Sequence, residues 1–206
     1  LDERPEFFTR EEMIAAFTLD RVNKAPASFD PQKLLAFQSR YMNELPLKQK
    51  AAMVLSYLQK AGLVASPPPC DTGPKLAAIC QAAGDRLKVA GDILAYDFFF
   101  VADDGLAYSE KDFEKRIRKP SEAAGLLSRF KAELSTVEPF DPPALETALK
   151  AFVEREGIEI GQLIHPLRIA VTGQPVGFGL FETLAILGRE SCAARIDAAL
   201  KMVEEK

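Results

Sequence analysis

The stretch from His165 to Glu190 reads HPLRIAVTGQPVGFGLFETLAILGRE. It predicts a short helix that ends at Thr172-Gly173, a Pro/Gly-rich loop over residues 174–179, and then a second helix. Gly173 suits the left-handed conformation that ends many helices. The second helix shows one apolar stripe, whose leucines recur every three to four residues: Leu180, Leu184 and Leu187.

The loop in this stretch is a candidate binding site. Gly177 and Gly179 flank Phe178 and place an aromatic ring on a permissive backbone, and Arg168 comes from the helix just before it. An exposed ring beside an arginine can stack on unpaired bases. The alternative is that Phe178 packs inward and Arg168 forms an ordinary salt bridge, and composition alone favours that alternative.

The composition is that of an ordinary globular protein. Its 206 residues suffice for one large or two small domains, and 48% of them are hydrophobic, which allows a real core. No run approaches the ~20 apolar residues that a membrane span needs. The first residues, LDERPEFF, do not resemble a signal peptide. Because the chain begins with Leu1 rather than Met, we interpret it as a piece of a longer polypeptide.

Cysteines and charges narrow the class of protein further. Three cysteines, Cys70, Cys80 and Cys192, are spaced like no zinc site, so we expect reduced thiols in a cytoplasmic protein. The net charge of −4 is no general signature of nucleic-acid binding. A basic run nonetheless exists, and it is either a solvated helix face or a contact for a phosphate backbone. Its members are Lys111, Lys115, Arg116, Arg118 and Lys119.

The rest of the sequence predicts helix after helix, so we expect an all-α fold. Thr9 with Glu12 predicts a capping box, and Asp30-Pro31 predicts the start of another helix. A further helix is expected over residues 86–96. The run at residues 98–101 has strand-like chemistry, but four residues are short enough to be simply buried.

Two segments resemble one family. PLRIAVTG followed by GLFETLAILGRE closely resembles the C-terminal anticodon-binding region of bacterial glutamyl-tRNA synthetases. The segment FTREEMIAAFTLDRVNKAPASFDPQKLLAFQSRYM resembles the stem-contact segment of that family, with Phe37 and Ser39 where Trp and Asn are usual. The resemblance implies that residues 1–44 end the stem-contact domain. Residues 45–119 would form the first part of a helical anticodon-binding domain, and residues 120–206 the C-terminal one.

The resemblance also implies site residues. Arg168 would contact an anticodon base, while Gly177, Phe178 and Leu180 align with positions around the other contacts. Where family members carry small polar and proline residues, this chain has Gly177 and Phe178. Backbone groups would therefore read a base at position 177, and stacking would be gained at 178. Arg86 stands where the family reads the third anticodon base, with an ordinary surface arginine as the alternative.

The sequence contains no set of residues typical of catalysis. The chain has one histidine, His165, and neither a KMSK-like element nor a glycine-rich phosphate loop. Cys192 lies early in the last predicted helix, where the pKa of a thiol can be lowered, but a second candidate histidine is missing. We therefore expect no cofactor in this chain. The resemblance places ATP and Mg on a catalytic Rossmann-type domain.

These observations predict the tRNA-recognition portion of a glutamate–tRNA ligase, the enzyme that attaches glutamate to tRNA-Glu using ATP. The expected partners are tRNA-Glu and the catalytic half of the same polypeptide, with no membrane and no DNA. The expected state is a monomer. Two alternatives stay open: a free-standing tRNA-binding or regulatory paralogue, and a helical module for protein docking. Whether tRNA-Gln is also a substrate depends on Arg86.

Overall fold

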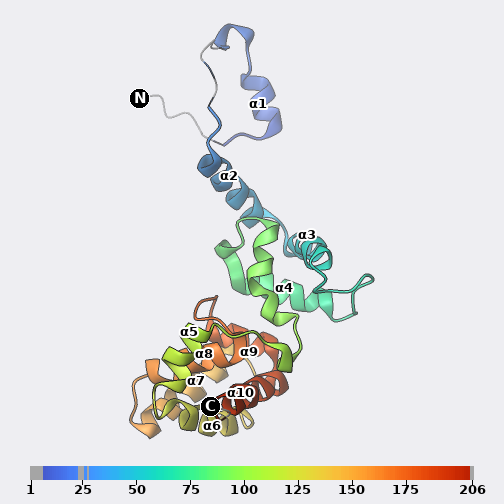
Figure 1. Cartoon of the computed structure of the whole chain (residues 1–206). Coiled ribbons are helices and arrows are strands. Elements are labelled where there is room, and N and C mark those ends of the chain that lie inside the picture. The colour runs from blue at the N-terminus through green and yellow to red at the C-terminus, as the bar shows by residue number, and fades with distance from the viewer. Residues whose placement is uncertain (1–6, 23–25, 27, 205–206) are drawn as a thin grey trace.

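The computed structural model describes residues 7–22, 26 and 28–204, and it confirms the all-α prediction for them (Figure 1). The α-helices are α1 (Arg10–Ala16), α2 (Pro31–Glu44), α3 (Leu47–Lys60), α4 (Thr72–Ala83), α5 (Glu110–Phe113), α6 (Ala123–Leu134), α7 (Pro142–Glu156), α8 (Gly161–Thr172), α9 (Leu180–Leu187) and α10 (Arg189–Glu204). Tighter 3₁₀ segments are η1 (Leu19–Arg21), η2 (Gly84–Arg86), η3 (Ala90–Phe99) and η4 (Asp103–Gly105), and η5 (Glu114–Arg118) is a π-helix.

Local capping chemistry sets the predicted helix ends. Glu12 N–H donates to Thr9 Oγ1 at 3.2 Å and Thr9 N–H donates to Glu12 Oε2 at 2.7 Å, which is the expected capping box. Asp30 accepts hydrogen bonds from two backbone amides in the first turn of α2. Gly157 and Gly173 end α7 and α8 in the left-handed conformation, with φ of 64° and 73°.

Residues 86–99 differ from the predicted regular helix. The chain forms the 3₁₀ segments η2 and η3 there, and Tyr96 interrupts η3 with φ −114° and ψ 29°. The strand-like run that follows is not a strand, because Phe98 and Phe99 end η3 as buried side chains. Its apolar composition reflects burial in a helical core.

Two hydrophobic clusters form the core. The first contains buried residues between Met42 and Leu106, together with Phe178 from the loop after α8. The second contains buried residues of α5 to α10, and Tyr108 packs against both clusters. In Figure 1 the helices α3 and α4, which carry much of the first cluster, lie in the middle of an elongated molecule, and α5 to α10 form its lower part. The domain boundaries expected after residues 44 and 119 stay predictions.

Helix α1 lies away from both clusters, and α2 leads from it to the first cluster, which its residue Met42 joins (Figure 1). Helix α1 buries none of its residues. Its apolar face, expected from the sequence, is open to solvent, with Met13, Ile14 and Phe17 exposed by 59%, 65% and 64%. No part of the described chain covers this face.

A buried arginine on α10 ties the two clusters together. The side chain of Arg195 is 2% exposed, and its Nε donates to Asp103 Oδ1 at 2.7 Å. Its other N–H groups donate to the main-chain carbonyls of Phe98 (2.9 Å), Val101 (3.3 Å) and Val171 (2.8 Å). Because these acceptors lie in η3, before η4 and in α8, one guanidinium fixes the first cluster against the second.

Candidate nucleic-acid interface

Arg168 lies on α8 and is held against the loop of residues 174–179. Its Nη1 donates to the main-chain oxygen of Phe178 at 2.9 Å, and a Cβ added at Gly177 would lie 3.3 Å from the same nitrogen. Arg168 forms no ion pair with any residue that the structure describes, so the salt-bridge alternative is wrong. A guanidinium has five N–H donors. One is used on the loop, and the half-buried side chain retains others for a ligand.

The expected exposed ring at Phe178 is wrong. The side chain is 2% exposed, and its ring stacks on Phe99 with centroids 5.7 Å apart and planes at 12°. Tyr96 packs on it as well, with centroids 5.2 Å apart. The aromatic residues of η3 offer the ring a better environment than water does. Leu180 is buried too, so both side chains position the loop, and their contact with RNA stays a prediction.

The structure brings Arg86 close to Arg168. Arg86 is exposed on η2, which follows α4, and helix α4 packs against α9. Burial lowers the pKa of Arg168, and the positive charge of Arg86 lowers it further, whereas the carboxylate of Glu182 raises it. The charges of two arginines from distant parts of the sequence therefore act on each other.

His165 is exposed one turn before Arg168 on the same helix. Burial lowers the pKa of its imidazole, and the positive charges of Arg116 and Arg168 lower it further. No described side chain donates a hydrogen bond to its ring or accepts one from it. The exposed ring fits the expected solvent-facing position.

The thiol of Cys192 is buried in the second cluster. Burial raises the pKa of its thiol to about 12, and Sγ lies 3.6 Å from the main-chain oxygen of Leu184. Burial therefore outweighs the lowering that a helix start can produce. Among the described residues no group of three or more His, Cys, Asp or Glu side chains is arranged to hold a metal ion. No helix of the described chain has the length and apolarity to cross a bilayer.

Basic side chains gathered on one face are an electrostatic feature of nucleic-acid-binding domains. A sequence profile described as "anticodon binding domain" matches residues 49–200, which is most of the chain. The chain therefore belongs to the anticodon binding domain family, a family of tRNA-binding domains.

The similar proteins are glutamate–tRNA ligases. The one from Moorella thermoacetica is 35% identical over 201 residues, which is 97% of this chain and 40% of that protein. The one from Herpetosiphon aurantiacus is 36% identical over 201 residues, or 96% of this chain and 40% of that protein. The chain thus spans about 40% of the length of these relatives.

A solved structure has the same fold. It is a glutamate tRNA ligase from Elizabethkingia meningosepticum in complex with its amino acid, and it superposes with a TM-score of 0.80 at 22% identity. The alignment covers 94% of this chain and 36% of that chain. At this identity the likeness establishes the helical fold.

Proposed function

We propose that this chain is the tRNA-recognition portion of a glutamate–tRNA ligase and that it binds the anticodon of tRNA-Glu. The family profile and the names of the relatives support the class of partner. The observation that carries the proposal is the placement of Arg168 on the loop, with Arg86 beside it and no carboxylate in an ion pair with either among the described residues.

The arrangement suits unpaired bases. An anticodon presents its Watson–Crick edges, and reading them requires donors and acceptors at fixed positions. The hydrogen bond to the Phe178 carbonyl fixes the guanidinium of Arg168, so its remaining N–H groups have a defined direction. Gly177 has no side chain that would cover the adjoining backbone, which leaves the peptide groups of the loop available to a base.

The proposal includes the rest of a longer polypeptide. Attachment of glutamate with ATP and Mg would take place on another part of it, and this chain would hold the tRNA for that reaction. We place the protein in the cytoplasm as a monomer, with tRNA-Glu as its partner and with neither a membrane nor DNA.

Replacing Arg168 with alanine is expected to weaken tRNA-Glu binding by about 1–3 kcal/mol and to reduce the preference for the native anticodon. Arg168→Lys is expected to bind tRNA-Glu only slightly better than Arg168→Ala, because an ammonium lacks the planar fork of donors. The measurement is a titration of each variant against tRNA-Glu and an anticodon-swapped tRNA-Glu, at two salt concentrations.

The matched control for this titration is Arg129→Ala. Arg129 pairs with Glu156 at 2.7 Å on an exposed surface, so its replacement makes the same change in charge away from the loop. A folded Arg168→Ala variant that discriminates anticodons as well as the control does would remove Arg168 from the site. Retention of a protein partner without any tRNA binding would instead favour a docking module.

A further inference from the structure

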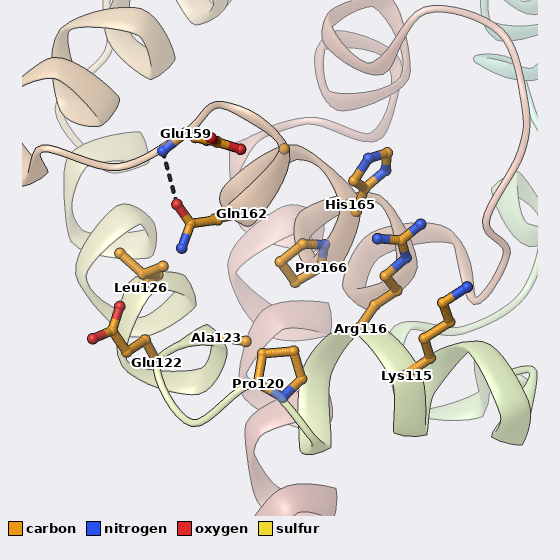
Figure 2. A pocket seen from close by; sticks show the side chains of 11 residues that line it. Lys115, Arg116, Pro120, Glu122, Ala123, Leu126, Glu159, Gln162, His165 and Pro166 are labelled. Carbon is orange, nitrogen blue, oxygen red and sulfur yellow. Dashed lines mark hydrogen bonds between the residues drawn. The ribbon is translucent and has the colours of Figure 1, made fainter.

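A cavity of about 360 Å³ opens beside the first turn of α8, within the size range of small-ligand sites. Figure 2 shows that its two sides differ in charge. Lys115 and Arg116 rise from η5 on one side, below His165, and Glu122 and Glu159 stand on the other. Pro120, Ala123 and Pro166 lie between them, and Leu126 lies beside Glu122.

The arginine of this cavity lacks the carboxylate partner that most of the neighbouring arginines have. Five of the seven arginines from residue 116 onward form ion pairs with carboxylates: Arg118, Arg129, Arg155, Arg189 and Arg195. Arg116 and Arg168 form none within the described chain, and neither does Lys115. Salt bridges could neutralise these positions at little cost. Arg116 and Arg168 therefore keep their positive charge unpaired near one imidazole among the described residues.

The π-helix directs Arg116 to the cavity. In η5 the amide of Lys119 donates to the carbonyl of Glu114, five residues back, at 2.9 Å. Single π turns are rare and are frequent at functional sites. Within this turn Ile117 is buried and Arg118 pairs with Glu114, while Arg116 is half-buried at the cavity. The basic run is therefore not one uniformly solvated face.

Positive charge extends from Lys115 and Arg116 toward Arg168, which is held against the loop of residues 174–179. The charges of Arg116 and Arg168 both act on His165, which stands between them, and the charge of Arg86 acts on Arg168. Three positive charges, those of Arg116, Arg168 and Arg86, therefore act within this region of the surface. Positive charges that act on one another repel, and a polyanion would relieve that repulsion.

We propose that Lys115, Arg116 and His165 bind a phosphate of the RNA strand beside the anticodon, so that the cavity takes one nucleotide outside the bases that are read. This inference rests on the proposed function. The phosphate would lie against Lys115 and Arg116, and the ribose would pack on Pro120 and Pro166. Glu122 and Glu159 would accept hydrogen bonds from hydroxyl or amino groups and would repel a second phosphate. The chemistry therefore fits one phosphodiester rather than a nucleoside polyphosphate.

The test uses the whole chain, a tRNA-Glu transcript and two double variants. Lys115→Ala/Arg116→Ala removes two cavity cations, and Lys111→Ala/Lys119→Ala removes the same charge from the same basic run outside the cavity lining. Lys115→Ala/Arg116→Ala should lose two phosphate contacts to a single strand, which lowers the magnitude of the slope of log K for tRNA-Glu binding against log salt by about 1.4. If the affinities of the variant and the wild type are equal at 1 M salt, this slope makes the variant bind about 25-fold more weakly at 0.1 M salt. Anticodon preference should persist, because phosphate contacts carry no sequence information.

The outcomes separate this inference from the proposed function. Binding that both double variants weaken equally would overturn the cavity site while leaving anticodon recognition intact. A wild-type chain that binds no tRNA would overturn the proposed function, and the phosphate site with it. Saturable binding of adenosine 5′-monophosphate at micromolar concentration would overturn the assignment to a strand in favour of a free nucleotide. Circular dichroism and thermal melting check that each variant is folded.

Discussion

Replacing Arg195 with alanine is expected to destabilise the chain by about 3–5 kcal/mol, which is a large share of the stability of most domains. The substitution leaves three main-chain carbonyls without their donor in a region where water has little access: those of Phe98, Val101 and Val171. It also removes the partner of Asp103, although that side chain is 33% exposed and keeps some solvation. Because the guanidinium joins the two clusters, we expect unfolding of the variant to become less cooperative as well.

Urea denaturation of the Arg195→Ala variant measures this effect. The control is Arg155→Ala, whose pair with Glu133 at 2.7 Å is solvent-exposed on the arginine side and is expected to contribute little to stability because water screens it. Arg195→Lys should recover part of the loss, because one ammonium cannot reach all the acceptors. Equal midpoints for the Arg195→Ala and Arg155→Ala variants would show that the buried hydrogen bonds do not hold the clusters together.

The features that the sequence predicted correctly are those set by neighbouring residues. The capping box at Thr9, the cap at Asp30 and the left-handed end at Gly173 each involve groups a few residues apart, so local chemistry decides them. The family likewise follows from a contiguous motif. The sequence predicts a regular helix near Tyr96, where the structure has 3₁₀ segments. Packing against distant helices overrides the local helix propensity there.

The site was predicted less well because its geometry depends on distant contacts. Whether Phe178 faces solvent is decided by Tyr96 and Phe99, which no local pattern connects to it.

The buried role of Arg195 was not predicted, although the sequence contains a signal for it. Arg195 occupies the buried stripe of α10 at helical spacing with apolar neighbours, Cys192, Ile196 and Ala199. A charged residue in the apolar stripe of a helix indicates a buried hydrogen-bonded role.

Phe178→Ala is expected to cost about 3–5 kcal/mol of stability, because it removes a ring buried between two aromatic side chains of the first cluster. Phe178→Leu should cost about 1–2 kcal/mol, since it keeps most of the buried apolar volume. Val176→Ala on the same loop is the control, because Val176 is 72% exposed and its truncation should change stability by less than about 0.5 kcal/mol.

The same variants distinguish a positioning role for Phe178 from base stacking. The carbonyl of Phe178 holds Arg168, so a loop that loses its buried anchor also loses the fixed direction of the guanidinium. Phe178→Leu retains the anchor and should therefore bind tRNA-Glu nearly as well as the wild type. Phe178→Ala should bind tRNA-Glu more weakly, even at temperatures where it is folded.

If the ring instead leaves the core and stacks on a base, both variants should lose about 1–3 kcal/mol of binding free energy. Unchanged stability of Phe178→Ala with weakened binding by both variants would contradict the buried anchor.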